Sequence, residues 1–268
     1  MIVEKYLRPW AMPTILCPGC AHGLVLRSFF EAVERLGLDQ DRTVLVAGIG
    51  CSARLVGYAD FCTLHTTHGR APGFATGVKL ARPELNVVVI TGDGDGLGIG
   101  GNHLIHAARR NVDVTVFLLN NAIYGMTGGQ TAPTTPRRAV ASTAPGGNLE
   151  SPFDACALMI GAGAGLVART LAAEQPVMTG IMVEALAHQG FSFVEVISDC
   201  PEYYGRYNEL GRGPEMLAWM KRREARVSVA IDQKRFVPHL PATPAASKLP
   251  TGILHREEKP VFTGRETQ

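Results

Sequence analysis

The 268-residue sequence lacks long apolar runs, a strong excess of charge of either sign and an amino-terminal targeting signal. A membrane-spanning helix needs roughly 18 or more apolar residues in a row. No run in this chain approaches that length, so we expect no membrane span. The formal net charge is only +2, which gives no reason to expect a nucleic-acid-binding surface, and the basic run at residues 221–223 is typical of a solvated helix face. The first residues do not follow the basic-then-apolar order of a signal peptide, so we expect a cytoplasmic protein.

Cysteine is scarce, with six residues in the chain, whereas glycine is plentiful, with 30. In a reducing cytoplasm, cysteines are more often metal ligands or buried small residues than disulfide partners. Many of the glycines fall in clusters, and clustered glycine indicates backbone that comes close to another group.

The rest of the pattern predicts an α/β fold. Short apolar segments rich in β-branched residues predict strands, and apolar residues three or four apart predict helices. The expected strands are residues 43–49, 86–91, 112–119 and 191–197, and the expected helices are residues 22–36, 101–110, 153–162, 177–188 and about 214–230. Apolar strands that alternate with helices indicate a parallel sheet covered by helices on both faces.

We expect this sheet and its helices to form one domain over residues 1–232. A Gly/Pro/Thr-rich stretch at residues 125–152 interrupts the pattern, and loops of that length are usually functional or mobile. Residues 233–268 are rich in Pro, Ala, Lys and Glu and have no clear period. We interpret them as a tail that is extended on a partner subunit.

The segment Thr-Gly-Asp-Gly-Asp-Gly at residues 91–96 follows a predicted buried strand. In open α/β sheets ligands bind at that edge. Small residues let backbone N–H groups approach phosphate oxygens, and a carboxylate in such a loop suits a divalent cation that bridges phosphates. The next strand ends in Asn120 and Asn121, 28 positions after Asp93. Either piece alone is usually only a turn or a loop, but the pair predicts a magnesium and diphosphate site.

A competing interpretation is a nicotinamide-dinucleotide site, because residues 96–101 fit the G-x-G-x-x-G pattern after a strand. Such a site also needs an acidic residue at the end of the next strand to hold the ribose. That strand ends in two asparagines, which disfavours this interpretation.

Four of the six cysteines stand where chain segments could converge. Cys17 and Cys20 form a C-x-x-C motif, and Cys51 and Cys200 each follow a predicted strand. Four thiolates can bind zinc or a [4Fe–4S] cluster, and the pattern alone does not decide between them. A thioredoxin-like redox pair is a third interpretation of the C-x-x-C motif. A non-catalytic, zinc-stabilised α/β domain also stays open.

The Gly-Asp-Gly and Asn-Asn pair resembles the signature of thiamine-diphosphate enzymes. With CPGCAHG, GIGCS, HTTHGRAPGFATGVKLA, LNNAIYGMTGGQTAPTTP and HQGFSFVEVISDCP, the sequence resembles the β subunits of 2-oxoacid:ferredoxin oxidoreductases over about residues 14–208. The resemblance implies the thiamine-diphosphate-binding, pyrophosphate-type fold. It implies Mg²⁺ on Asp93, Asn121 and the Ile123 carbonyl, and a [4Fe–4S] cluster on Cys17, Cys20, Cys51 and Cys200. Cys62 and Cys156 match no ligand position, and we expect both to be buried free thiols.

The resemblance also implies a set of cofactor contacts. These are Gly50, Ser52, His68, Gly92, Asp93, Gly94, Asp95, Asn121, Ile123, Tyr124, Gly125, Met126 and Thr127. His68 and Arg70 are candidates for catalytic contacts. Arg54 is a further candidate, since its guanidinium could pair with the distal carboxylate of a dicarboxylic substrate. That role favours 2-oxoglutarate over pyruvate.

The implied activity is the coenzyme A-dependent oxidative decarboxylation of a 2-oxoacid, with electrons passed through the cluster to ferredoxin, or the reverse reductive carboxylation. The favoured substrate is 2-oxoglutarate, which gives succinyl-CoA and CO₂, and the alternatives are pyruvate and branched-chain 2-oxoacids. A thiamine carboligase or decarboxylase would have no use for four convergent cysteines. No glutamate is placed to activate the thiamine, and in this family it comes from the α subunit. We therefore expect an αβ enzyme, paired again by two-fold symmetry.

Overall fold

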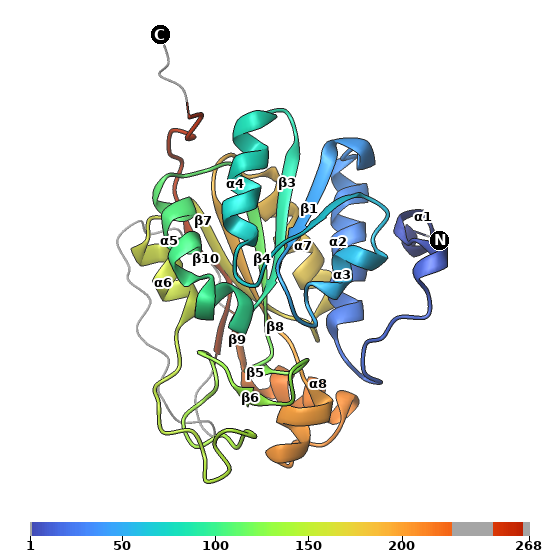
Figure 1. Ribbon diagram of the computed structural model, residues 1–268, viewed down its shortest axis with the longest axis vertical. Helices are drawn as coiled ribbons and strands as arrows, with labels where there is room; N and C mark the ends of the chain where they lie inside the picture. The colour runs from blue at the N-terminus through green and yellow to red at the C-terminus, as the bar shows by residue number, and fades with distance from the viewer. Residues whose placement is uncertain (1, 227–248, 265–268) are drawn as a thin grey trace.

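The computed structural model describes residues 2–226 and 249–264 of the chain (Figure 1). These residues contain an eight-stranded sheet in the order β2-β1-β3-β4-β8-β7-β10-β9 and a two-stranded sheet, β5-β6. The strands are β1 (Thr43–Ala47), β2 (Cys62–His65), β3 (Asn86–Gly92), β4 (Thr115–Asn120), β5 (Ile123–Tyr124), β6 (Gln130–Thr131), β7 (Leu166–Leu171), β8 (Ser192–Ile197), β9 (Glu224–Arg226) and β10 (Leu249–Arg256).

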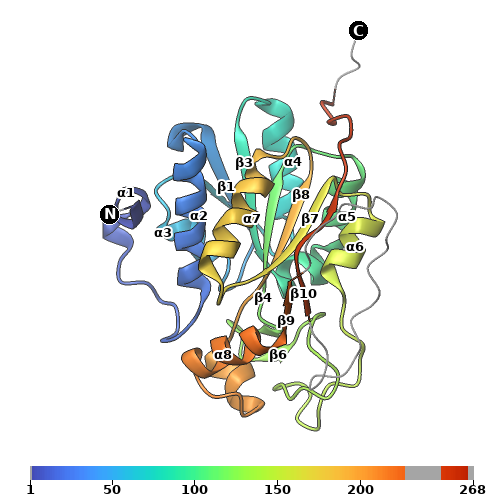
Figure 2. The ribbon, with the colours of Figure 1, turned by 180° about the vertical axis from the view of Figure 1, so that it is seen from behind.

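Helices cover both faces of the large sheet. Those of one face are α2 (His22–Leu36), α3 (Arg54–Tyr58) and α7 (Gln175–Ala187), and α2 and α7 lie in front in Figure 2. Those of the other face are α4 (Ala71–Ala81), α5 (Gly101–Arg109) and α6 (Ala155–Gly161). The remaining helices are α1 (Ile2–Tyr6), α8 (Gly213–Arg223), the 3₁₀ turns η1 (Pro9–Ala11) and η2 (Gln40–Arg42), and the π-helical turns η3 (Gly94–Ile99) and η4 (Pro201–Gly205).

The two hydrophobic cores explain why the central strands are apolar throughout. In β3, Val88 and Ile90 face the core under α2 and α7, whereas Val87 and Val89 face the core under α4 and α5. Successive strand residues point to opposite faces, so a strand covered on both sides buries every residue. Burial of one such side chain contributes about 1.5–3 kcal/mol. The rigid strands therefore hold the loops at their ends in fixed positions.

The predicted α/β fold is confirmed, and α2 has the predicted bounds. The elements β2, β7, α3 and α4 were not predicted: β2 and α3 are short, α4 contains proline and glycine, and β7 is as long as β4 and β8 but carries Arg169 among its apolar residues. The helix expected over about 214–230 ends at Arg223, because the chain turns there into β9. No helix of the described residues is long and apolar enough to cross a membrane.

The expectation for residues 233–268 needs correction in one part. Residues 249–256 form β10, which pairs antiparallel with β7 of the same chain, so this segment belongs to the sheet of the main domain and not to a separate tail. The sheet is accordingly mixed at this edge. Pro250 and Gly252 interrupt the strand pattern in the sequence, which explains the error. Residues 233–248 and 265–268 lie outside the described part of the chain.

Candidate active site at the carboxyl ends of the strands

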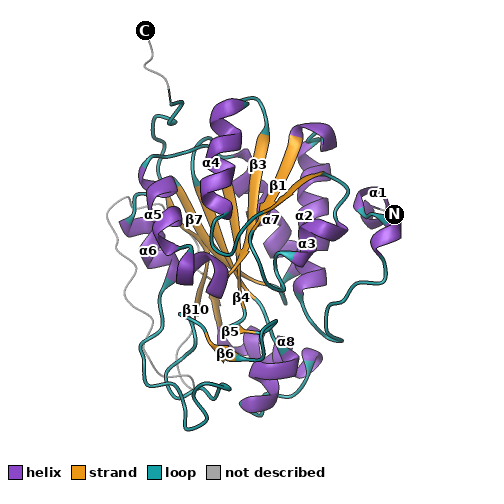
Figure 3. Cartoon of the chain, viewed as in Figure 1, coloured by secondary structure: helices purple, strands orange, loops and turns teal. Residues whose placement is uncertain are grey.

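The loops that leave the carboxyl ends of the central strands enclose one cavity. Because β1, β3 and β4 are parallel, with Ala47 opposite Ile90 and Gly92 opposite Leu119, these loops emerge side by side. Figure 3 shows the lower ends of the strands facing the loops that carry β5 and β6. The cavity has a volume of about 270 Å³, and its wall consists of His22, Ile49, Gly50, Cys51, Ser52, His68, Gly92, Asp93, Gly94, Asp95, Leu119, Asn121, Ile123, Tyr124, Gly125, Met126 and Thr127. Every residue that the sequence analysis assigned to cofactor contact lines it.

Asp93 directly follows β3 and is buried in the cavity wall. Its Oδ1 accepts a hydrogen bond of 3.0 Å from the Gly94 N–H, and its Oδ2 accepts one from the Thr134 hydroxyl. Burial raises the pKa of Asp93 to about 6, although these two donors and the backbone N–H groups of Asp93 and Ala122 oppose the rise. A buried carboxylate whose charge these donors do not fully compensate is suited to a cation.

Asn121 follows β4 and stands at the same edge as Asp93. Its Oδ1 accepts a hydrogen bond of 3.3 Å from the Ile123 N–H, and Ala122 between them has a left-handed backbone, with φ of 61°. Tyr124 ties this loop to the glycine loop, because its hydroxyl donates to the Gly94 carbonyl at 3.0 Å. A Cβ at Gly94 would overlap the Tyr124 ring, which explains the glycine there.

Asp95 has a structural role in addition to lining the cavity. Its Oδ1 accepts from the N–H groups of Ile49 and Gly69 at 3.1 and 2.7 Å, and its Oδ2 accepts from the Thr91 hydroxyl at 2.6 Å. His68 Nδ1 lies 2.6 Å from the same Oδ1. One buried carboxylate therefore joins the loops after β1, β2 and β3.

Cys17, Cys20, Cys51 and Cys200 converge beside this cavity. Each thiol interacts electrostatically with at least two of the others. A Cβ placed on Gly125 would lie 3.4 Å from Cys200 Sγ and 3.6 Å from Cys51 Sγ, so the loop that carries Asn121 packs against the thiols. Burial raises the pKa of Cys20 to about 12, and Asp199 and neighbouring thiols add to that rise. Burial, with the thiols of Cys200 and Cys17, raises the pKa of Cys51 to about 11. Cys20 and Cys51 therefore need a cationic centre to become thiolates at neutral pH.

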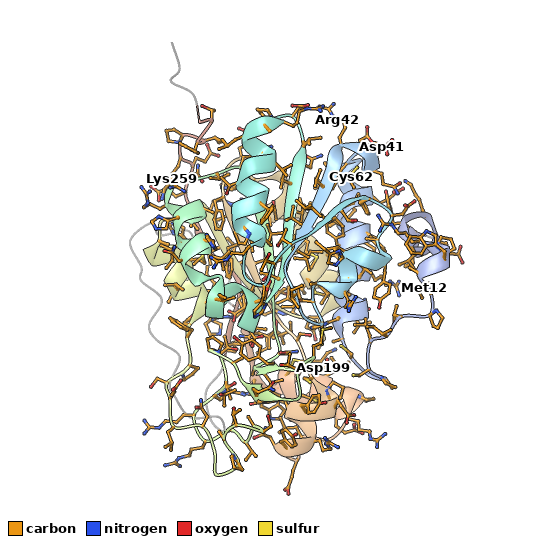
Figure 4. The ribbon with its side chains drawn as sticks, viewed as in Figure 1. Met12, Asp41, Arg42, Cys62, Asp199 and Lys259 are labelled. Atoms are coloured by element: carbon orange, nitrogen blue, oxygen red, sulfur yellow. The ribbon has the colours of Figure 1, made fainter. Side chains whose placement is uncertain are left out.

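Asp199, labelled in Figure 4, lies between the sheet and α8. Its Oδ1 accepts a hydrogen bond of 2.8 Å from the Ala21 N–H. That bond joins the loop of Cys17 and Cys20 to the segment that carries Cys200. Cys62, in the same figure, lies apart from this group on β2. It is exposed, so the expectation of a buried thiol is wrong for Cys62 and confirmed for Cys156.

His22 is a cavity residue that the sequence analysis did not assign to the site. Its side chain is 1% exposed, and neither ring nitrogen has a hydrogen-bond partner within the described residues. Burial lowers the pKa of His22 to about 4, so the ring is neutral and offers one donor and one acceptor to the cavity. Its place two residues after Cys20, at the start of α2, was the signal that could have identified it.

Arg54 and Arg70 do not line the cavity. Arg54 is exposed at the start of α3. Arg70 contacts the ring of His103 on α5. Of the three proposed catalytic residues, the structure brings only His68 into the cavity wall.

Comparison with known proteins agrees with this geometry. Residues 48–196 match the C-terminal TPP-binding domain of thiamine pyrophosphate enzymes. The 2-oxoglutarate synthase subunit KorB of Methanothermobacter marburgensis is 52% identical over 217 residues, which cover 81% of this chain and 76% of that protein. The 2-oxoacid:ferredoxin oxidoreductase subunit beta of Saccharolobus solfataricus is 37% identical over 90% of this chain and 81% of its own length.

A solved structure supports the same assignment. The 2-oxoglutarate:ferredoxin oxidoreductase from Magnetococcus marinus, with 2-oxoglutarate, coenzyme A and succinyl-CoA bound, has a TM-score of 0.86 and 34% identity. The match covers 98% of this chain and 87% of the other. This chain therefore belongs to the thiamine pyrophosphate enzymes and, among them, to the β subunits of the 2-oxoacid:ferredoxin oxidoreductases.

Proposed function

We propose that this chain, together with an α subunit, oxidatively decarboxylates 2-oxoglutarate to succinyl-CoA and CO₂ and passes the electrons to ferredoxin. The observation that carries the proposal is the contact between two sites: Cys51 lines the cavity, and a Cβ placed on Gly125, another residue of the cavity wall, would lie 3.6 Å from Cys51 Sγ and 3.4 Å from Cys200 Sγ. Electron transfer needs such proximity, whereas a carboligase or decarboxylase would not. The names of the similar proteins support 2-oxoglutarate over pyruvate or a branched-chain 2-oxoacid. The same residues would serve reductive carboxylation.

We propose that thiamine diphosphate and Mg²⁺ bind in the cavity. Asp93, Asn121 and the Ile123 carbonyl would hold the metal, since they supply oxygen ligands at one edge of the sheet. The glycine loop and the start of η3 would face the diphosphate. The cofactor, when bound, supplies an electron sink for loss of CO₂. The chain's own residues bind and orient it, and the neutral His22 ring offers hydrogen bonds to the cavity occupant.

For the four thiols we propose a [4Fe–4S] cluster rather than zinc. Thiolates on one zinc ion, at Zn–S distances of about 2.3 Å, lie about 3.8 Å apart. Among the described residues, the one set of three acidic, histidine or cysteine ligand atoms within 4.8 Å of each other is Asp154, Cys156 and Glu195. No three of Cys17, Cys20, Cys51 and Cys200 meet this limit, which supports a centre larger than one zinc ion. All four are free cysteines, which gives no support to a disulfide redox pair.

We propose that the α subunit completes the site. Thiamine activation requires a carboxylate at the aminopyrimidine, and no glutamate is among the residues that line the cavity. The acidic residues there are Asp93 and Asp95, and both are engaged with protein groups. We also propose a cytoplasmic αβ enzyme, paired by two-fold symmetry, since free thiols and a reduced cluster are compatible with a reducing compartment.

The isolated chain is therefore expected to be inactive. Expressed alone without oxygen, it should be brown and contain iron and sulfide, yet catalyse no 2-oxoacid-dependent reduction of a viologen dye. Addition of the α subunit should restore the reaction. Turnover by the isolated chain would refute the need for a partner, and a colourless, zinc-containing chain would refute the cluster.

Arg54 gives a prediction about substrate choice. If its exposed guanidinium pairs with the distal carboxylate of 2-oxoglutarate, Arg54→Ala should raise KM for 2-oxoglutarate by about tenfold, as expected for loss of roughly 1.4 kcal/mol of uniform binding. KM for pyruvate should not change. Steady-state kinetics of the αβ enzyme with both acids would test this. Equal changes for the two acids would assign Arg54 a role unrelated to the substrate.

A further inference from the structure

A chain of buried polar contacts runs from the middle of the sheet to the Asn121 loop. Arg169 on β7 and Glu195 on β8 face each other in the strand register, and each is 1% exposed. Arg169 Nε donates to Glu195 Oε2 at 2.6 Å, and its Nη2 donates to Asp154 Oδ1 at 2.7 Å. Buried ion pairs are often replaceable by apolar residues without loss of stability, so their presence needs another explanation.

The second carboxylate oxygen of Glu195, beside the one that accepts from Arg169, connects the ion pair to the loop that carries Asn121. Glu195 Oε1 accepts a hydrogen bond of 2.7 Å from Asn120 Nδ2, and Asn120 Oδ1 in turn accepts one of 3.0 Å from the Ala122 N–H. The Ala122 carbonyl is held from the other side by the Thr135 hydroxyl at 2.7 Å. Ala122 is the residue with φ of 61°, a conformation that costs a non-glycine residue about 1–2 kcal/mol. Fixed partners at both its N–H and its carbonyl hold it there.

Glu195 is suited to this position because an ionised carboxylate accepts hydrogen bonds at both oxygens. One oxygen receives Arg169 Nε and the Cys156 thiol, and the other receives the Asn120 amide. The carboxylate thereby fixes which way the Asn120 amide points, with its oxygen toward the Ala122 N–H. Arg169 supplies the positive charge among Asp154, Cys156 and Glu195, so that group is an ion-pair network and not a metal site.

We infer that Glu195 is a positioning residue, which holds Asn121 and the Ile123 carbonyl in the arrangement that binds the divalent cation and acts through Asn120 and Ala122. The inference rests on the metal site proposed above. Groups that orient metal ligands typically change metal affinity by 10–100-fold when they are removed.

Two substitutions in the αβ enzyme test the inference. Glu195→Gln keeps the shape of the side chain but leaves it one acceptor oxygen. When that oxygen accepts from Arg169, the glutamine NH₂ faces the Asn120 NH₂. Because two donors cannot pair, the Asn120 amide must turn, and its oxygen no longer accepts from the Ala122 N–H. Asn120→Ala removes the connection and leaves the ion pairs intact. Asp154→Asn is the matched control, because its oxygen can still accept from Arg169 Nη2 and the Ala157 N–H while the network loses one charge.

The measurement is the Kd for Mn²⁺, read from the paramagnetic signal of the free ion, on enzyme stripped of divalent cation and supplied with thiamine diphosphate; Tm is recorded in parallel. We expect Mn²⁺ binding about tenfold weaker in both Glu195→Gln and Asn120→Ala. Asp154→Asn should lower Tm and leave the Kd near that of the wild type. If Glu195→Gln does not fold, the Kd of Asn120→Ala for Mn²⁺ still tests the inference.

Wild-type affinity in Asn120→Ala, or in a folded Glu195→Gln, would overturn the inference. So would an equal loss of affinity in Asp154→Asn, because the network would then act only through stability. If the wild-type enzyme itself bound no Mn²⁺, the proposed metal site would be wrong and the inference would fall with it. A wild-type enzyme that binds Mn²⁺, with variants that bind it equally well, would instead refute only the role of Glu195 and leave the metal site standing.

Discussion

Asp93→Asn in the αβ enzyme is expected to lower kcat/KM for the 2-oxoacid by more than about 100-fold. Removal of a group that only orients a metal ligand typically lowers metal affinity or activity by about 10–100-fold, and loss of a ligand itself should have a larger effect. The substitution keeps the shape of the side chain but removes the charge that we assign to Mg²⁺. Asp41→Asn is the control, since Asp41 is exposed at the opposite end of the sheet (Figure 4). Activity and thiamine diphosphate affinity should be measured over a range of Mg²⁺ concentrations. Wild-type values for Asp93→Asn would exclude Asp93 as a metal ligand.

The same substitution should not destabilise the metal-free protein. Burial raises the pKa of Asp93 to about 6, above its ordinary value, so the ionised carboxylate opposes folding at pH 7. This unfavourable contribution shrinks as pH falls below 6, where the folded protein binds the proton, and disappears near the ordinary pKa of 3.8, where the unfolded chain binds it too. Metal-free Asp93→Asn should therefore have the higher Tm at pH 7, and the difference should shrink toward pH 5. A lower Tm at pH 7 would contradict the assignment of Asp93 as a residue retained for binding and not for stability.

Cys51→Ser is expected to abolish electron transfer. Cys51 is the thiol that lines the cavity, and its loss would remove one of four ligands to the cluster. Iron content, brown colour and ferredoxin reduction should all fall. Thiamine diphosphate should still bind, because Asp93 and Asn121 are held by contacts that do not involve the thiols.

Cys62→Ser is the matched control for this experiment, since Cys62 is exposed on β2 and apart from the cluster loops. It should retain full iron content and activity. A Cys51→Ser enzyme that keeps its iron and still reduces ferredoxin would exclude the proposed ligand set.

Sequence predicted which residues lie together at this edge of the sheet, because these residues follow apolar strands. The strands before Asp93 and Asn121 are recognisable from composition, and parallel neighbours must end at one edge. The convergence of four cysteines was expected in the same way, from the C-x-x-C motif and from the strands before Cys51 and Cys200.

The remainder depended on spatial information that the sequence does not carry. The ion pair of Arg169 and Glu195 requires knowledge that β7 lies beside β8, and β7 was not predicted. Arg54 stands three residues after Cys51, yet it is exposed at the start of α3 and does not line the cavity. β10 was not predicted because Pro250 and Gly252 interrupt its strand pattern, and its antiparallel partner β7 lies more than 80 residues earlier.

The most direct test of the central claim is 2-oxoacid-dependent viologen reduction by the αβ enzyme, purified without oxygen and assayed with and without coenzyme A. We predict reduction that requires coenzyme A and is faster with 2-oxoglutarate than with pyruvate. A preference for pyruvate would keep the enzyme class and change the substrate. No reduction with any 2-oxoacid, from enzyme shown to contain iron and thiamine diphosphate, would contradict the proposed reaction.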